Sequence, residues 1–325
     1  MRYPDRNRET MAPPTSHPKA TGSAHVHLLQ SVLLSSSGPD QARQEWLRSQ
    51  FHPVTLAQLN EKADMLERLD NKYVIRSGIL QRAAPLLAQH FDALEIGGKR
   101  AFSYVTRYFD DAGYSGYFDH HRGRRQRCKV RIRRYDDAQT CFVEIKLKGK
   151  RGITVKIRRK HPIELFGTLD AKAMTFVRDT YRAFYGRDLD PALEPALDVR
   201  YERVSLVAKT GRERMTIDSR LKFSKADDSI AVSDEVFVVE TKSPNGNGIA
   251  DKILRGFHQH STRNCSKYCI GIASLRTDSK RNNFLPTLRK FYSTDSLNRT
   301  LRPMVRPSCD RAEPACSELL RNEVP

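Results

Sequence analysis

The sequence predicts an α+β fold: an antiparallel β-tunnel, which is a closed barrel with a polar cationic lumen, and helices packed outside it. Three observations predict this architecture. Charged and apolar residues alternate along five segments, as they do in strands with one polar face. Cations crowd into one stretch of the chain, and segments with helical apolar spacing flank the strands. A closed barrel would turn the charged faces inward and leave the apolar faces to the helices.

The composition indicates a folded protein with a polyanionic partner. Lys and Arg number 57 against 38 Asp and Glu, and a bound anion would relieve the self-repulsion of the resulting net charge of +19. Hydrophobic residues make up 38% of the chain, which is enough for a core. No apolar run is long enough for a spanning helix or a signal peptide. The six cysteines form no CxxC motif, so we expect a reducing, cytoplasmic location.

The two ends of the chain differ from its middle. Residues 1–45 are rich in Ser, Pro, His and Gly with little periodicity, which predicts a disordered N-terminal leader. Residues 298–325 mix Arg, Pro and Glu without a pattern, which predicts a disordered C-terminal tail. We therefore expect one folded domain over residues 46–297, a length that a single α+β domain can have.

Apolar residues at three-to-four spacing predict four helices around the strands. Pro85 falls inside the second of them, where it removes one helical hydrogen bond. Gly186 supplies a stop signal for the third. The expected helices cover residues 54–66, which lead into a strand at 68–75, and then 77–90, 168–184 and 249–257.

The strands carry the charge. In residues 129–133, Lys129, Arg131 and Arg133 would share one strand face, and two β-branched residues the other. Four further segments repeat this alternation. Their polar or charged sets are Glu144, Lys146 and Lys148; Thr154, Lys156 and Arg158; Arg212, Arg214, Thr216, Asp218, Arg220 and Lys222; and Glu240 and Lys242, which share a face with Val238.

The density of like charge distinguishes this pattern from an ordinary solvated sheet. Residues 121–160 contain sixteen Lys and Arg but three Asp and Glu, a net charge of +13. A solvent-facing sheet would explain any single strand, yet such a surface usually mixes its signs. Like charges on neighbouring strands destabilise a sheet unless an anion lies between them. The pattern therefore favours an enclosed site for a polyanion.

Two carboxylates interrupt the cationic faces. Glu144 and Glu240 each stand two residues before a lysine, Lys146 and Lys242. One or two carboxylates plus phosphate oxygens are the ligands that Mg²⁺ prefers, and Mn²⁺ resembles it. A salt bridge to neighbouring cations is the alternative for each Glu-x-Lys taken alone. The pair together favours a site for Mn²⁺ or Mg²⁺.

Several short segments together resemble the VTC, or polyphosphate polymerase, domain family of the CYTH-like triphosphate tunnel metalloenzymes. The likeness covers about residues 68–271, and the order and spacing of its parts make it specific. The parts are Arg68-x-Asp70-x-Lys72-Tyr73, Tyr108-Phe109-Asp110, Lys129-Val130-Arg131-Ile132-Arg133-Arg134-Tyr135, Phe142-Val143-Glu144-Ile145-Lys146, Val155-Lys156-Ile157-Arg158, Tyr201-Glu202-Arg203, Thr216-Ile217-Asp218, Val239-Glu240-Thr241-Lys242 and Ser266-Lys267-Tyr268.

The resemblance implies an antiparallel tunnel that holds a triphosphate and a polymerase that extends polyphosphate with the γ-phosphoryl group of ATP. It makes Glu240 the principal metal ligand with Glu144 in support, and assigns catalysis to Lys72, Arg131, Arg133, Lys146 and Glu240. Arg68 and Asp70 stand where the wider superfamily has two glutamates, which favours the VTC branch over a two-metal triphosphatase. The implied phosphate ligands are Lys72, Arg131, Arg133, Lys146, Lys156, Arg158, Arg203, Lys242 and Lys267.

Two alternatives stay open at this point: a triphosphatase that hydrolyses ATP or short polyphosphate, and a non-catalytic module that binds polyphosphate or nucleic acid. The family's eukaryotic polymerases are associated with membrane subunits, so a membrane partner is compatible with the resemblance. Other motifs receive no role. We expect His120 and His121 to be exposed, and Cys265 and Cys269 to be buried or partly exposed thiols. We expect Gly97-Gly98 to form a turn between a helix and a strand, and Gly246-Asn247-Gly248 to form a loop before the next helix.

Overall fold

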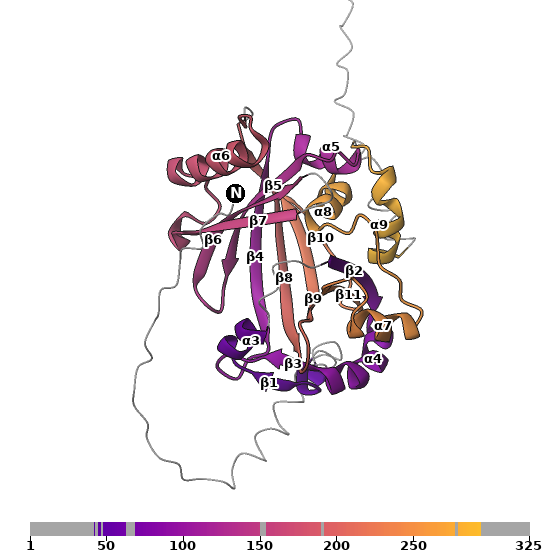
Figure 1. Cartoon of the computed structure of the whole chain (residues 1–325). Coiled ribbons are helices and arrows are strands. Elements are labelled where there is room, and N and C mark those ends of the chain that lie inside the picture. Colours follow the sequence, from indigo (N-terminus) through magenta and orange to yellow (C-terminus); the bar gives the residue numbers. More distant parts are fainter. Residues whose placement is uncertain are drawn as a thin grey trace, which may run out of the picture. The chain divides into compact units, whose positions relative to one another are not determined.

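The computed structural model describes residues 42, 45, 46, 48–62, 69–149, 154–189, 192–276 and 279–293 (Figure 1). The chain divides into a unit of residues 1–44 and a unit of residues 45–325, and the fold described below belongs to the second. Apart from residues 42 and 45, the predicted leader and tail lie outside the described residues. The predicted boundaries at 45 and 298 therefore stay predictions.

Strands and helices are arranged as an α+β fold, as predicted. The strands are β1 (His52–Val54), β2 (Leu69–Arg76), β3 (Phe91–Leu94), β4 (Ala101–Asp110), β5 (Arg127–Tyr135), β6 (Thr140–Lys148), β7 (Thr154–His161), β8 (Glu194–Ala208), β9 (Arg214–Lys225), β10 (Asp228–Ala231) and β11 (Val236–Ser243). The helices are α3 (Leu56–Lys62), α4 (Ser77–His90), α5 (Ser115–His121), α6 (Ala171–Tyr185), α7 (Ile249–Gly256), α8 (Lys267–Leu275) and α9 (Leu285–Phe291), with short 3₁₀ turns at Ile163–Leu165 and Asn282–Phe284.

One sheet contains all eleven of these strands, and its main path runs β2-β11-β9-β8-β4-β5-β6-β7. Every pairing along this path is antiparallel. The short strands β1, β3 and β10 attach at the side, and only β1 and β3 pair in parallel within the described part of the chain. The antiparallel sheet that the alternation predicted is thus present.

The predicted closure of the barrel is wrong for the described residues. β2 and β7 end the path, and no ladder joins them within the part of the chain that the structure describes. Lys72 on β2 and Lys156 on β7 carry like charges, which oppose direct pairing of two strands. The sheet is therefore open at one seam.

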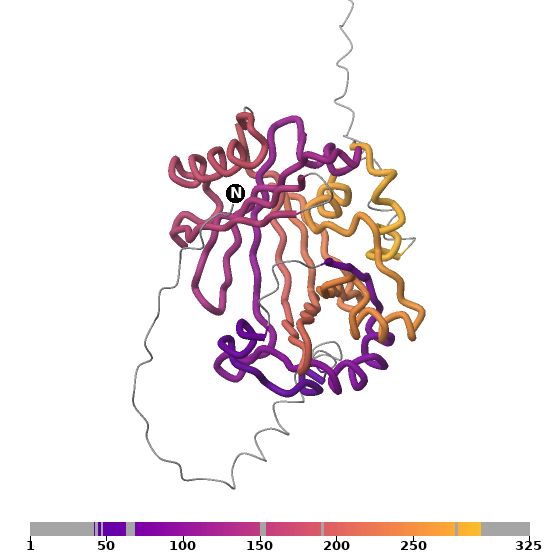
Figure 2. The backbone as a smooth tube through the Cα atoms, viewed as in Figure 1, coloured from indigo at the N-terminus to yellow at the C-terminus, as the bar shows by residue number. Residues whose placement is uncertain are grey.

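The sheet nevertheless curls, so that side chains from its two ends interact. Five strands separate β6 from β2 in the path, yet Lys146 on β6 interacts electrostatically with Lys72 on β2 and with Glu240 on β11. Figure 1 shows β7 running across β4 and β8 in this view, and Figure 2 traces the same curl through the backbone. We call the side that carries Lys72, Lys146 and Glu240 the concave face.

Helices cover the outer face, as predicted for the apolar side of each strand. Val177 of α6 packs with Ile132 of β5 and Ile145 of β6 in one buried cluster. Leu87 of α4 and Leu254 of α7 belong to a second cluster, which covers β2, β9 and β11. Burial of these apolar faces is what stabilises the curled sheet.

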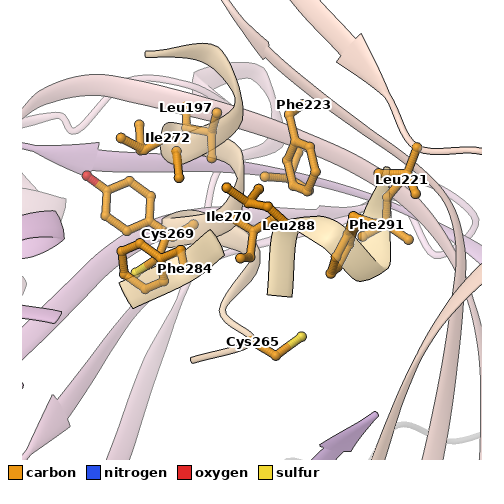
Figure 3. Packing of buried hydrophobic residues seen from close by; sticks show 14 of the residues in the cluster. Leu197, Leu221, Phe223, Cys265, Cys269, Ile270, Ile272, Phe284, Leu288 and Phe291 are labelled. Carbon is orange, nitrogen blue, oxygen red and sulfur yellow. The ribbon is translucent and has the colours of Figure 1, made fainter. Parts of the chain in front are cut away.

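Helices α8 and α9 fill one end of the concave face instead. Their Ile270, Ile272 and Leu288 belong to the same buried cluster as Leu197 of β8 and Phe223 of β9 (Figure 3). The cluster also takes in the end of β4 and the ends of β2 and β11. The concave face therefore has an apolar end under α8 and α9 and a charged remainder.

A β-bulge separates these two parts on β9. Asp218 pairs with Arg203, but beyond a register shift Phe223 pairs with Val199, and Arg220 has a φ of 51°. The extra residue reverses which side chains face inward. We predicted Arg220 and Lys222 on the same face as Asp218, and this is wrong: Arg220 instead forms an ion pair with Glu202, which alternates with Arg203 and so faces outward.

Three expected helices form with small shifts at their ends. Residues 77–90 form α4, and α7 ends one residue early. α6 begins at Ala171, not at 168, because the Asp170 side chain accepts a hydrogen bond from the Ala173 N–H, and it ends before Gly186 at φ 70°. The first helix is the shorter α3, and residues 63–68 lie outside the described part. None of the described helices is long and apolar enough to cross a membrane.

The close packing of α8 predicts a stability effect at Gly271. A Cβ there would lie 2.5 Å from Leu197 Cδ2 and 2.7 Å from Phe223 Cδ1. Gly271→Ala should therefore lower the free energy of unfolding by about 1–3 kcal/mol despite the better helix propensity of alanine. Gly78→Ala in α4 is the matched control, because a Cβ there meets nothing within 4 Å. Urea unfolding measures both, and a Gly271→Ala chain as stable as the wild type would contradict the packing.

Candidate functional site

The β-ladders bring the predicted site residues together on the concave face. Lys129, Lys146 and Lys156 pair in one row across β5, β6 and β7, and Arg131, Glu144 and Arg158 pair in the next. On the other side of the curl, Lys72 pairs with Glu240. Among the described residues, the charged side chains of this face include ten cations and three carboxylates: Lys72, Lys129, Arg131, Arg133, Lys146, Lys156, Arg158, Arg203, Lys242 and Lys267, with Glu144, Asp218 and Glu240.

Glu240 lies between two lysines. Its Oε2 is 3.1 Å from Lys72 Nζ and its Oε1 is 3.2 Å from Lys242 Nζ. Burial opposes ionisation of Glu240, but Lys72 and Lys242 outweigh it and hold the pKa of the carboxyl well below its usual range. Glu240 is therefore an ionised carboxylate at neutral pH.

Glu144 is more deeply buried, with 1% of its side chain exposed. Arg131 Nε and Nη2 lie 2.6 and 2.5 Å from its Oε2, and Lys156 Nζ is 3.6 Å from its Oε1. Burial alone would raise the pKa of Glu144, but Arg131 and its cationic neighbours lower it. Its Oε1 accepts no hydrogen bond from the described residues.

Asp218 is the site residue that sequence reasoning passed over as a candidate. Arg203 Nε and Nη2 donate to its two oxygens at 2.6 and 2.9 Å, and Lys267 at the start of α8 also contacts it. Burial is outweighed by Arg203 and Lys267, and the pKa of Asp218 falls to about 2. Its place in the alternating segment with Thr216 was the available signal.

Four cations of the face form no ion pair with a carboxylate within 4 Å in the described part of the chain: Lys129, Arg133, Lys146 and Arg158. Arg158 lies over the ring of Phe142, 4.8 Å from its centre. Arg133 donates to Thr106 Oγ1 at 3.2 Å and lies 5.7 and 6.0 Å from the ring centres of Tyr104 and Tyr201. Burial first, and neighbouring cations next, lower the pKa values of Lys129 and Lys146 to about 8. An anion on this face would supply the negatively charged partner that these side chains lack.

Buried polar atoms point to the same need. Tyr201 Oη, Thr216 Oγ1 and Glu144 Oε1 are buried without a hydrogen-bond partner among the described residues. A native protein rarely leaves such atoms unsatisfied unless water, an ion or a ligand completes them. All three lie on the concave face, which favours a polar ligand there.

The carboxylates fit a metal ion that arrives with phosphate. No cluster of three His, Cys, Asp or Glu occurs among the residues that the structure covers, so a cage built by the protein alone does not fit. One or two carboxylates completed by phosphate oxygens are the usual ligands of Mg²⁺. Glu144 Oε1, which lacks a hydrogen bond, and the ionised Glu240 are hard oxygen donors of this kind.

The remaining motifs have structural settings. We predicted that His120 and His121 are exposed, and this is wrong. Both lie on α5, where His121 is buried and contacts Asn282 Oδ1 at 2.7 Å. Cys265 and Cys269 are buried free thiols, as predicted. Gly97–Gly98 form a turn, as predicted, but the turn joins the strands β3 and β4 and not a helix and a strand. Residues 244–248 form the expected loop before α7. Arg68 of the first motif lies outside the described residues.

Comparison with known proteins identifies a family. The VTC domain model matches residues 67–276. No curated protein shows significant similarity. Among solved structures, a proposed adenylyl cyclase from Hippeastrum, described as having a dominant triphosphatase activity, is 12% identical with a TM-score of 0.41, covering 64% of this chain and 96% of that one. A proposed adenylate cyclase from Bacillus halodurans is 13% identical with a TM-score of 0.39, covering 61% of this chain and 95% of that one.

The pKa of Lys129 predicts a pH-dependent stability. The pKa is about 8 in the folded chain and near 10.4 for an unfolded lysine, so between these values the unfolded state binds more protons. The free energy of unfolding therefore gains a contribution that rises with pH across this window. Lys129→Met removes this titrating group. At pH 7 the variant should be more stable than the wild type, because it lacks the buried charge, and this difference in the free energy of unfolding should shrink between pH 7 and pH 10. Urea unfolding at both pH values measures this, and an unchanged difference would contradict it.

Proposed function

The chain belongs to the VTC domain family, and from that premise we propose that it is a metal-dependent polyphosphate polymerase. It would transfer the γ-phosphoryl group of ATP onto a polyphosphate chain on the concave face. The observation that carries the proposal is the convergence of ten cations with three ionised carboxylates on that face, within the described residues. The cations outnumber the carboxylates, and a triphosphate or polyphosphate would neutralise the surplus.

Phosphate binding follows from the residue types. The guanidinium groups of Arg131, Arg133 and Arg203 can each make two parallel hydrogen bonds to a phosphate, which a lysine cannot. Arg131 and Arg203 are already oriented by Glu144 and Asp218. The lysines of the row Lys129–Lys146–Lys156 add mobile point charges beside them. The arginines would therefore fix the reacting phosphates and the lysines would compensate charge.

A divalent cation, Mn²⁺ or Mg²⁺, would be held by Glu240 and supported by Glu144, together with phosphate oxygens. When bound, it would supply Lewis acidity and alignment of the phosphates. The protein's own part is to fix the triphosphate and to stabilise charge on the non-bridging oxygens of the transferred group. In the transfer, the bond from the γ-phosphorus to the β,γ-bridging oxygen breaks, ADP leaves, and a terminal phosphate oxygen of the acceptor bonds to that phosphorus.

The carboxylates argue against a module that only binds polyanions. Each buried carboxylate lowers the net positive charge of the face and would weaken the binding of polyphosphate or nucleic acid. Glu144, Asp218 and Glu240 hold neighbouring cations in place, but each also repels a bound anion, which is a cost for a surface that only binds polyanions. Their presence favours chemistry on a bound phosphate over binding without turnover.

Hydrolysis is the second candidate. The open seam of the sheet and the exposed side chain of Lys156 admit solvent to the concave face. Water could then replace the polyphosphate terminus as acceptor, which would make the protein a triphosphatase for ATP or short polyphosphate. A cytoplasmic location and a possible membrane partner stay predictions, as does the extent of the domain over residues 46–297.

The first test is incubation of the full chain with ATP and Mn²⁺ or Mg²⁺, followed by phosphorus NMR. We expect signals of internal phosphates of long chains. Glu240→Gln should abolish turnover yet keep most of the affinity for tripolyphosphate, because it removes a metal ligand and leaves the cations. Glu202→Gln is the matched control, since Glu202 pairs with Arg48 and Arg220 on the outer face.

The products decide between the candidates. Orthophosphate as the sole product would replace the polymerase with the triphosphatase. Wild-type turnover by Glu240→Gln would refute the role of Glu240. Absence of turnover with either metal, combined with binding to single-stranded DNA that weakens steeply with salt, would replace both enzymes with a nucleic-acid-binding module.

Arg133 provides a separate prediction, because it is buried without a carboxylate partner in the described part of the chain. Arg133→Met should make the ligand-free protein at least as stable as the wild type, since an uncompensated buried charge is costly. The same variant should bind tripolyphosphate about tenfold or more weakly, the loss expected for a charge-assisted contact. Urea unfolding and calorimetry measure the two effects. An unchanged affinity would remove Arg133 from the phosphate site.

A further inference from the structure

His120 on α5 contacts Lys129, one of the four cations of the face that lack a carboxylate partner within the described residues. Its Nε2 lies 2.6 Å from Lys129 Nζ, and its Nδ1 lies 3.0 Å from the backbone oxygen of Gly116, one helical turn earlier. These two contacts use both nitrogens of the ring. The side chain therefore bridges the backbone of α5 and the charged row of β5.

The chemistry of the two contacts fixes the tautomer. The Gly116 carbonyl can only accept a hydrogen bond, so Nδ1 carries the proton. Nε2 of the neutral ring then has a free lone pair, and Lys129 must donate to it. Burial, followed by the charge of Lys129, lowers the pKa of His120 to about 2, which keeps the ring neutral. His120 is thus a fixed acceptor for an ammonium group.

The other neighbours of Lys129 are mostly cationic. Lys146 faces it across the ladder, Arg127 and Arg131 flank it on β5, Lys72 approaches from β2, and the thiol of Cys269 from α8. Four of these five groups carry positive charge and repel it. Lys129 also lines a cavity of about 270 Å³ together with Tyr108 and Tyr268. Without His120, repulsion would turn the lysine out of its row or favour its neutral form.

We propose that His120 is a positioning residue that holds the Lys129 ammonium on the concave face, where it would contact a phosphoryl group of the substrate. The proposal rests on the proposed phosphate chemistry of that face. His121 has a different setting, because it contacts Asn282 and packs near Tyr117 and Phe284. The adjacent histidine therefore serves as an internal comparison.

Two substitutions separate the two contacts of the ring. His120→Asn keeps a side-chain N–H near the Nδ1 position for Gly116 but removes the acceptor for Lys129. His120→Gln places an amide oxygen near the Nε2 position and keeps that acceptor. We expect His120→Asn to bind tripolyphosphate about tenfold more weakly, the usual loss for a hydrogen bond to a charged group, and to lose affinity at lower pH than the wild type. His120→Gln should stay within about threefold, on the same scale.

A double-mutant cycle tests whether the effect passes through Lys129. In a Lys129→Met background, His120→Asn should leave the affinity for tripolyphosphate unchanged. Three outcomes would each overturn the proposal. The affinity for tripolyphosphate could still fall in the Lys129→Met background, it could fall equally in His120→Asn and His120→Gln, or His120→Asn could bind as tightly as the wild type. His121→Gln should leave the affinity unchanged, and a loss as large as that of His120→Asn would overturn it too.

If the His120→Asn protein does not fold, a measurement on the wild-type chain still tests the proposal. The ¹⁵N shifts of the imidazole should report an Nδ1–H tautomer that stays neutral down to pH 5. An Nε2–H tautomer or a charged ring would overturn the proposal. The binding assays use tripolyphosphate alone and need no turnover. If ATP yields no polymer, the proposed polymerase activity is refuted, but the role of His120 is still tested by the binding and NMR data.

Discussion

Repulsion among the cations of the concave face is the constraint on which the rest of the structure depends. Charges of one sign on neighbouring strands destabilise a sheet, and burial adds a desolvation cost. Glu144, Asp218 and Glu240 each lie between two of these cations and offset part of that cost. The apolar outer face supplies the opposing free energy, since α4, α6 and α7 bury it against the strands. On each of these strands, burial of the apolar outer face therefore offsets the repulsion among the charges of the concave face.

The bulge on β9 decides where this charged face ends. Before it, Asp218 faces inward with Arg203; after it, Phe223 faces inward and packs under α8. A single extra residue thus converts a polar strand face into an apolar one. Because α8 starts with Lys267 and continues with buried apolar residues, the same helix contributes a cation to the site and fills the remaining space. The charged part of the face is confined to the region where carboxylates and aromatic rings can hold it.

Strand-level features could be predicted from the sequence because a period of two residues records a face directly. The alternation alone is enough to place Arg131, Lys146 and Glu240 on polar strand faces. Closure could not be predicted, because it depends on pairing between β2 and β7, which lie at opposite ends of the path. The β9 bulge breaks the alternation that the prediction relied on. Helix α8 is buried almost all round and α5 is short, so neither shows the one-sided periodicity that reveals a helix.

The distribution of carboxylates divides the cations into two groups with different physical roles. Six cations, namely Arg131, Arg203, Lys72, Lys156, Lys242 and Lys267, have a carboxylate partner, so their positions are fixed without ligand. Lys129, Arg133 and Lys146 are held instead by an imidazole, a hydroxyl and the surrounding field, and Arg158 lies over the ring of Phe142. Lys129, Arg133 and Lys146 keep an unfavourable charge in the ligand-free protein, which an anion relieves when it binds. Part of the binding free energy of a phosphate chain would then come from strain already present in the fold, and such a ligand would stabilise the folded state by an amount that grows with the logarithm of its concentration once the site is mostly filled.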